Sequence, residues 1–366
     1  MEGVQFQING ESNQDNAVDS ATVRVTRRLP GTGGTLNSVR ISVEPIAIAG
    51  THPSLEKGRE LFQRLADHDT LERALLSLST GINDAQPLYL NISDETGTAS
   101  RLPWETLFFE DDFLALRTQR SIARVTDSRE KSLIHPTLSS SIRIMSVISM
   151  MGSPGEDEWR AVQDAITATR ADQLANRPGL QPEHLLLVGE QDLYQTAQSE
   201  SAQDASLQAE MIPRNSAALI DRIKAYEPHI LHLYCHGDSR PRLLFGTNVD
   251  WLQGTSSEGS LRLRADEVAQ AARDAGTWVV VLNACLSGAA ADDGPSAVEE
   301  LVANGVPVAV GHRVYIQPSF ATQLTEALYP DLFALLADTI ERGRSDGSTQ
   351  EIEWAQLLWR ARRNSA

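Results

Sequence analysis

A histidine and a cysteine each follow a short apolar run, and a glycine stands close behind each of them. His236 follows the run at residues 230–235, and Cys285 lies within the segment NACLSG at residues 283–288. A thiolate is a strong nucleophile, but a free thiol has a pKa of about 8.5 and needs a nearby base at neutral pH. An imidazole can accept that proton and return it to a leaving amine. The two residue types together predict nucleophilic catalysis, with His236 and Cys285 as the catalytic residues.

The order of the elements predicts that these two residues meet at one edge of a sheet. The run at residues 278–282 precedes Cys285, and one strand–helix–strand unit separates it from the run before His236. Right-handed crossover places two such strands beside or near each other, with their carboxyl ends at the same edge. Because Gly237 has no Cβ to shield its N–H, the N–H groups of Gly237 and Cys285 are the predicted oxyanion hole.

The alternation of apolar runs with helical patterns predicts an α/β fold. Several runs are nearly continuous in valine, isoleucine and leucine, which is typical of strands covered on both faces. Helical patterns between them include residues 156–176, 265–275 and 296–304. We therefore predict a layered domain with a mostly parallel central sheet flanked by helices, plus a short β-rich segment at the N-terminus. The apolar runs lie at residues 87–92, 113–116, 142–150, 184–188, 230–235, 278–282 and 306–310.

Changes in composition divide the chain into three predicted parts. Residues 1–53 form the β-rich segment, residues 54–340 the main α/β domain, and residues 341–366 a linker and a last helix that packs on that domain. The segment at residues 191–208 has few large apolar side chains, which predicts a surface loop. The polar stretch at residues 341–350 is predicted to be the linker before the last helix.

Length, composition and charge exclude several classes of protein. The chain has 366 residues, 41% of them hydrophobic, and 32 basic against 49 acidic residues leave a formal net charge of −17. This composition is globular, and an acidic chain does not favour binding to nucleic acid or to an anionic membrane. We expect no signal peptide and no apolar run of the about 20 residues that span a bilayer, so the predicted location is the cytoplasm.

The remaining cysteine and histidine residues favour structural interpretations. Cys235 precedes His236 in a strand, so its side chain is predicted to point away from the site and into the core. His232 lies within the same apolar run, and we expect it to be buried and hydrogen-bonded. Two cysteines exclude a disulfide framework and a four-cysteine zinc site. Since adjacent acidic residues are typical of solvated loops, we expect no metal and no cofactor.

These motifs resemble those of the CHAT domain, a family of caspase-like cysteine peptidases in the clan of caspases, metacaspases and separase. The segments LHLYCHG at residues 231–237 and NACLSG at residues 283–288 resemble its histidine and cysteine motifs. The segment LPWETL at residues 102–107 resembles its Pro-Trp-Glu segment, and residues 301–311 resemble the helix, glycine and strand that follow the cysteine. The resemblance spans roughly residues 60–337.

The resemblance implies a caspase-like fold, the same catalytic dyad, and an oxyanion hole made by Gly237 and Cys285. Metacaspases carry an acidic residue two positions before the cysteine, where this chain has the neutral Asn283, so we expect an uncharged P1 side chain. Arg313 follows His312 where the family often has tryptophan, which alters the expected wall of the pocket. The predicted substrate-binding residues are Asp238, Asn283, His312, Arg313 and Glu105.

The sequence as a whole predicts a cysteine endopeptidase that cleaves a specific protein partner. The resemblance to the family implies a place in a bacterial defence or conflict pathway, which we state as an expectation. The expected partners are the protein substrate and an activating protein or ligand, with no nucleic acid and no membrane. The alternative is a non-catalytic caspase-like scaffold that serves as an interaction module, although the presence of both His236 and Cys285 favours the peptidase. A nucleotide-binding domain is a third interpretation, but the chain has no phosphate-binding loop.

Overall fold

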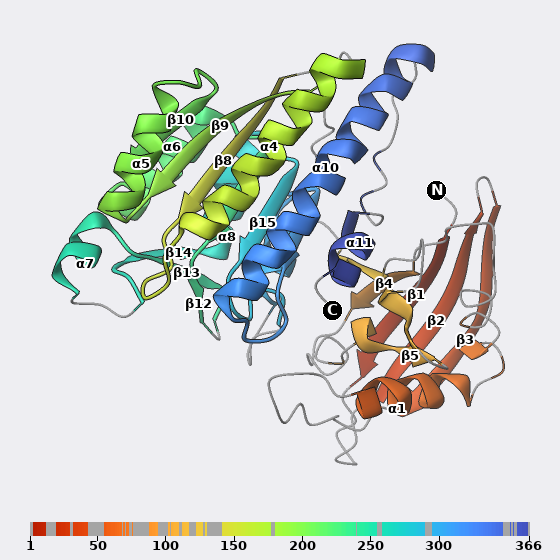
Figure 1. Ribbon diagram of the computed structural model, residues 1–366. Coiled ribbons are helices and arrows are strands. Elements are labelled where there is room, and N and C mark those ends of the chain that lie inside the picture. The colour runs from red at the N-terminus through yellow and green to blue at the C-terminus, as the bar shows by residue number, and fades with distance from the viewer. Residues whose placement is uncertain are drawn as a thin grey trace. The chain divides into compact units, whose positions relative to one another are not determined.

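The computed structural model divides into two compact units, Met1–Asp127 with Glu353–Ala366 and Ser128–Ile352 (Figure 1). Each unit has its own sheet and its own hydrophobic core. The structure describes residues 3–11, 20–29, 32–42, 55–67, 69, 71–72, 75, 88–93, 102, 104–109, 112–116, 122–126, 129, 141–176, 180–238, 240–254, 258–289, 295–346, 352, 354 and 357–364.

The larger unit is built on six parallel strands in the order β10-β9-β8-β11-β15-β16. Every residue of β11 (Ile230–Tyr234) and β15 (Val279–Asn283) is buried, as their nearly continuous apolar sequences predict. These two strands are neighbours, and Tyr234 pairs with Asn283. The prediction of a mostly parallel central sheet is therefore confirmed. The other strands are β8 (Ser141–Ile148), β9 (Gln181–Val188), β10 (Leu207–Met211) and β16 (Val308–Gly311).

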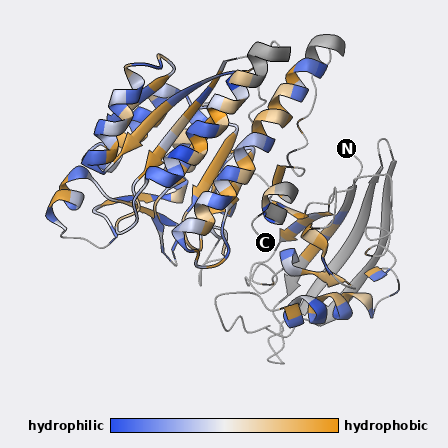
Figure 2. Ribbon diagram, viewed as in Figure 1, coloured by the Kyte–Doolittle hydropathy of each residue, from blue (hydrophilic) through white to orange (hydrophobic). Residues whose placement is uncertain are grey.

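Helices cover both faces of this sheet, and Figure 2 shows hydrophobic strands enclosed between them. On one face, α4 and α10 lie side by side and contribute Trp159 and Ala321 to the core, together with α5. On the other face, α6, α8 and α9 pack against the alternate strand residues, such as Leu233 and Leu282. No helix in the described part of the chain is long and apolar enough to cross a membrane. The helices are α4 (Glu156–Asn176), α5 (Gln191–Ser201), α6 (Ser216–Tyr226), α8 (Ala265–Asp274), α9 (Ala297–Ala303) and α10 (Pro318–Asp346).

Local sequence determines where the helices around β15 begin and end. The chain leaves α8 through Gly276, whose φ of +72° is a conformation that glycine adopts without strain. The next helix, α9, begins at a capping box in which Ser296 and Glu299 bond to each other's backbone N–H groups. It ends before Gly305, which has a φ of +100°. These ends agree with the predicted helices and fix the path of the chain before and after Cys285.

A small antiparallel sheet follows β11 directly. It consists of β12 (His236–Gly237), β13 (Arg242–Phe245) and β14 (Leu261–Arg264), with the short helix α7 (Asn248–Gln253) between the last two. His236 pairs with Leu244 in this sheet. The predicted catalytic histidine is therefore held by strand pairing rather than carried on a free loop.

The smaller unit has a mixed five-stranded sheet in the order β3-β2-β1-β4-β7. Its first three strands are antiparallel, while β4 and β7 join in parallel, which agrees with the predicted β-rich segment. Phe6, Ile8 and Trp104 are fully buried in its core. The elements are β1 (Gly3–Glu11), β2 (Ser20–Leu29), β3 (Thr32–Ser42), α1 (Leu55–Ala66), β4 (Leu88–Ser93), η1 (Trp104–Thr106), β5 (Phe108–Phe109), β6 (Asp112–Phe113), η2 (Leu114–Leu116), β7 (Ile122–Val125) and α11 (Leu357–Asn364).

Three predicted elements are wrong. Residues 191–208, predicted as a surface loop, form α5 and the start of β10, because Leu193 and Ala197, four positions apart, are buried against the sheet. The predicted linker at residues 341–350 begins as part of a helix, since α10 runs to Asp346. The run at residues 113–116, predicted as a strand, is mostly the 3₁₀ turn η2. In each case local composition is a weaker determinant than packing against the rest of the unit.

Candidate active site

The carboxyl ends of three adjacent strands bring the predicted catalytic residues to one edge of the sheet. His236 follows β11, Cys285 follows β15, and Met151 lies in the loop after β8 on the other side of β11. From β8 the sheet grows one way to β10, and it grows the opposite way from β11 to β16. The boundary between β8 and β11 is thus a topological switch point, which is where ligands bind in open α/β sheets.

The histidine and cysteine turns touch through their backbones. A Cβ built on Gly237 would lie only 2.2 Å from the carbonyl oxygen of Cys285, so only glycine allows this approach. One residue before His236, the N–H of Cys235 donates to the carbonyl of Asn283 at 3.3 Å. The two motifs, 49 residues apart in the sequence, therefore form one continuous surface at the edge of the sheet.

A backbone carbonyl orients the imidazole of His236. Its Nε2 lies 2.7 Å from the carbonyl oxygen of Met151, and because a carbonyl only accepts, Nε2 carries the proton. The neutral ring then presents Nδ1 as a proton acceptor. Ser149 holds the Met151 loop, since its N–H donates to Tyr234 and its hydroxyl donates to the carbonyl of Gly246. The ring is therefore in the tautomer that a base at Nδ1 requires.

Cys285 sits in a tight and strained turn. The next residue, Leu286, has a φ of +57°, a conformation that costs a residue with a side chain about 1–2 kcal/mol. Cys285 is half-buried, and its Sγ–H donates to the carbonyl of Ile316 at 3.6 Å. Cys235, by contrast, is fully buried, and burial raises the pKa of its thiol well above the usual range. Only Cys285 is therefore placed to react with a molecule from solution.

The residues predicted to bind substrate lie in different surroundings. The carboxylate of Asp238 is half-buried and accepts from the Nε of Arg242 at 2.9 Å, so its charge is compensated. Arg313 packs beside the cysteine turn, its Cγ 3.4 Å from a Cβ built on Gly288. Glu105 belongs to the other unit, where its carboxylate pairs with Arg124 at 2.7 Å. The roles of these residues in substrate binding stay predictions.

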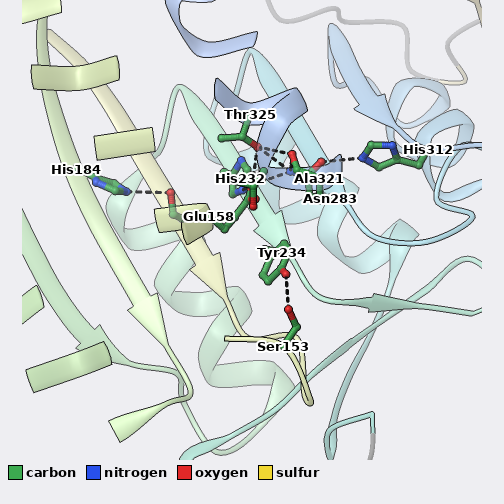
Figure 3. Close-up of polar contacts among 11 residues, drawn as sticks. Ser153, Glu158, His184, His232, Tyr234, Asn283, His312, Ala321 and Thr325 are labelled. Carbon is green, nitrogen blue, oxygen red and sulfur yellow. Dashed lines mark hydrogen bonds and ion pairs between the residues drawn. The ribbon is translucent and has the colours of Figure 1, made fainter. Parts of the chain in front are cut away.

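Asn283 and His312 belong to a buried polar cluster between the sheet and helices α4 and α10 (Figure 3). The Nδ2 of Asn283 donates to Glu158 Oε1 at 2.6 Å and to Thr325 Oγ1 at 2.7 Å. Its Oδ1 accepts from the Nε2 of His312 at 2.9 Å. His232 completes the cluster, with its Nε2 also 2.9 Å from Glu158 Oε1, and is buried as predicted. The side chain two positions before Cys285 therefore faces the interior of the unit.

The pKa of Glu158 is lowered in spite of its full burial. Burial alone raises the pKa of a carboxyl group, but the hydrogen bond and charge of His232 and the hydrogen bonds from Thr325 and Asn283 lower the pKa of Glu158 below its usual value. His312 shows the opposite case, because burial lowers its pKa to about 4 and outweighs the charge of Glu158. The pKa values of both residues are therefore lowered, that of Glu158 by its hydrogen bonds and the charge of His232 and that of His312 by burial.

Sequence reasoning missed Met151, Glu158 and Thr325. Met151 contributes a backbone carbonyl, and no side-chain pattern identifies such an atom. Glu158 did leave a signal, since it precedes Val162 and Ile166 by four and eight residues and so lies on the buried stripe of α4. An acidic residue on such a stripe indicates a buried polar partner. Across the described residues, no group of three or more His, Cys, Asp or Glu side chains could hold a metal ion.

The buried histidine His184, outside this cluster, predicts acid sensitivity. His184 bonds to Gln163 and Ser146, and burial, with the charges of His232 and Arg170, lowers its pKa to about 3. An unfolded histidine has a pKa of about 6.5, so the unfolded chain binds more protons below that pH. We expect this residue alone to cost about 2 kcal/mol of unfolding free energy between pH 7 and pH 5.

Urea unfolding at pH 7 and pH 5 tests this expectation. In the variant His184→Asn, which does not titrate, the loss between the two pH values should be smaller by about 2 kcal/mol. An equal pH dependence in both proteins would contradict it.

The six-stranded parallel sheet, flanked by helices and carrying a histidine and a cysteine at one carboxyl edge, defines a caspase-like fold. The sequence model of the CHAT domain family matches residues 55–342. This match covers most of the chain and includes both the histidine and the cysteine motif. The chain belongs to the CHAT domain family, a family of caspase-like peptidases. Among curated proteins, no relative matches the sequence.

Proposed function

We propose that this CHAT domain protein is a cysteine endopeptidase with Cys285 as the nucleophile and His236 as the base. The observation that carries the proposal is the backbone contact between Gly237 and Cys285, which joins the two turns at the ends of neighbouring strands. The contact places Gly237 and Cys285 next to each other, and in the proposal both of their N–H groups face the substrate. Those two donors are what an oxyanion hole requires.

The proposed reaction proceeds by acyl transfer. Nδ1 of His236 takes the proton from the thiol, and Sγ forms a bond to the carbonyl carbon of the scissile peptide. The resulting oxyanion accepts from the N–H groups of Gly237 and Cys285. As the C–N bond breaks, the proton on Nδ1 moves to the leaving amine, and water then hydrolyses the thioester to restore the thiol. Throughout, the bond from Nε2 to the Met151 carbonyl keeps the ring oriented.

The thiol must first leave its partner in the resting protein. A carbonyl oxygen accepts a hydrogen bond but does not take a proton, so the contact between Sγ and Ile316 does not activate the thiol. In the proposed cycle, binding of the substrate or of an activating protein or ligand releases Sγ towards His236. The same contact supports the alternative function, a caspase-like scaffold that binds partners without chemistry.

The proposed substrate is a specific protein partner with an uncharged P1 side chain. Asn283 is neutral, and the charge of Asp238 is compensated by Arg242. Neither residue therefore offers an unpaired negative charge to a basic P1 side chain. We place the protein in the cytoplasm, where its two cysteines stay reduced, and in a bacterial defence or conflict pathway by likeness to its family.

Alkylation tests the proposal directly. The purified protein is treated with iodoacetamide at neutral pH and then incubated with a proteome-derived peptide library, and new N-termini are identified by mass spectrometry. We expect Cys285 to be modified while Cys235 is protected, and cleavage to fall in proportion to the modification of Cys285. Cleavage that persists after complete modification of Cys285 would refute the peptidase. Absence of cleavage, with Cys285 reacting no faster than a cysteine in a short peptide, would favour the scaffold.

A further inference from the structure

His312 holds both ends of the turn that carries Cys285. Before the cysteine, its ring donates from Nε2 to Oδ1 of Asn283 at 2.9 Å. After the cysteine, its backbone N–H donates to Ser287 Oγ at 3.0 Å, and its carbonyl accepts from the N–H of Gly288 at 2.8 Å. A single residue at the end of β16 therefore spans the whole segment from residue 283 to residue 288.

Glu158 determines how the amide of Asn283 is turned. The three atoms around Nδ2 are Glu158 Oε1, Thr325 Oγ1 and the carbonyl oxygen of Ala321, at 2.6, 2.7 and 3.1 Å. The carboxylate and the carbonyl can only accept, and the Thr325 hydroxyl already donates to Glu158 at 2.5 Å. The NH₂ group must therefore face α4 and α10, which directs Oδ1 to the N–H of His312.

The turn between these contacts needs external support. Leu286 has a φ of +57°, and a residue with a side chain persists in that conformation only where its surroundings impose it. The N–H of Leu286 donates to the carbonyl of Val314 at a long 3.3 Å, so this bond contributes weakly. The contacts of His312 on either side of Leu286 are shorter, and they restrain the turn together with the N–H of Val298, which donates to the carbonyl of Ser287 at 2.9 Å.

We propose that Glu158, Asn283 and His312 act as a positioning clamp, which holds the Cys285 turn in the conformation that presents the thiol and the Cys285 N–H to a substrate. The clamp acts through Cys285 and touches no reacting atom, so its members are positioning residues. This inference rests on the proposed peptidase function. In this inference the inward contacts give Asn283 and His312 a positioning role in place of the substrate contact predicted from the sequence.

The test compares two substitutions of His312 that differ in one N–H donor. His312→Gln keeps a side-chain N–H that can donate to Asn283 Oδ1, whereas His312→Leu removes this donor. Both variants keep the backbone N–H and carbonyl of residue 312, which bond to Ser287 and Gly288. Gln163→Met is the matched control, because Gln163 is also a buried polar residue of α4 but bonds to His184 on β9, away from β15.

Two measurements are made on each full-length protein. Amide hydrogen exchange at Leu286 and Gly288 should be faster by about tenfold or more in His312→Leu and close to wild type in His312→Gln and Gln163→Met. For peptide cleavage, His312→Leu should lower kcat by about tenfold or more with little change in KM, because ground-state binding is retained. His312→Gln should restore kcat, which a role in folding alone would not predict.

Unchanged exchange at Leu286 and Gly288 in His312→Leu would overturn the clamp, whatever the peptidase activity. If the wild-type protein cleaves no peptide, the proposed function fails while the exchange measurement still decides on the clamp. An equal increase of exchange in Gln163→Met would also overturn it, because the effect would then follow from general destabilisation.

Discussion

Replacing Cys285 by alanine is expected to lower the rate of substrate cleavage by a factor of about 10³ or more. The variant lacks the sulfur that forms the bond to the substrate, and nothing in the described site offers a second nucleophile on the same turn except the buried Ser287. Folding should change little, by less than about 0.5 kcal/mol, because Cys285 is half-buried and its hydrogen bond to Ile316 is weak. Cleavage assays and thermal unfolding measure the two effects separately.

Cys235 provides the matched control with the opposite pattern. It is fully buried, so Cys235→Ser places a hydroxyl in apolar surroundings and should cost about 1–3 kcal/mol of unfolding free energy. Below its melting temperature, the folded Cys235→Ser protein should retain cleavage activity. Equal loss of activity from both substitutions, without unfolding, would contradict the assignment of Cys285 as the nucleophile.

The central sheet could be predicted because the apolar composition of its strands reflects their burial on both faces. A strand buried on both faces needs mostly apolar side chains, and β11 and β15 are apolar except for His232 and Asn283, which bond within the buried cluster. The helix α9 could be predicted for a different reason, since Ser296 and Gly305 are residue types that helix ends require. In these cases the physical cause is local, so the sequence shows it.

The segments that could not be predicted depend on partners far away in the chain. The sequence of α5 is mostly polar, and only Leu193 and Ala197 are buried against the sheet, with the partly buried Tyr194 packed beside them. Two apolar contacts four positions apart are too weak a pattern to separate a helix from a loop. Its helical structure is a consequence of packing on the sheet, which the segment's own sequence does not contain.

In the candidate site, too, some features could be predicted from the sequence and others could not. That His236 and Cys285 lie at the same edge follows from the parallel pairing of β11 and β15, because strands that follow each other in a chain are usually neighbours in the sheet. That Asn283 faces inward depends on the pleat, because its neighbours Leu282 and Ala284 occupy the face covered by α8. The bond from His236 to Met151 involves a backbone carbonyl, for which the residue type carries no information. The edge of the sheet at which the two residues lie can thus be predicted from the sequence, whereas the hydrogen-bond partners of Asn283 and His236 can be identified only from the folded structure.

Gly237→Ala is expected to lower cleavage by a factor of about 10²–10³, the effect of losing one donor from an oxyanion hole. An added Cβ would lie 2.2 Å from the carbonyl oxygen of Cys285, closer than any real contact, so one of the two turns must move. Both turns carry predicted oxyanion donors, and any displacement separates them. Overpacking at this point should also cost about 1–3 kcal/mol of unfolding free energy.

Gly276→Ala separates the loss of activity from the loss of stability. Gly276 has a φ of +72° with no heavy atom within 4 Å of its added Cβ, so the substitution costs about 1 kcal/mol of backbone strain without a steric clash. It lies before β15, at the opposite edge of the sheet from Cys285. With both variants assayed below their melting temperatures, Gly276→Ala should cleave at the wild-type rate. If Gly237→Ala does so as well, the N–H of Gly237 takes no part in stabilising the oxyanion, and the close contact between the two turns serves packing alone.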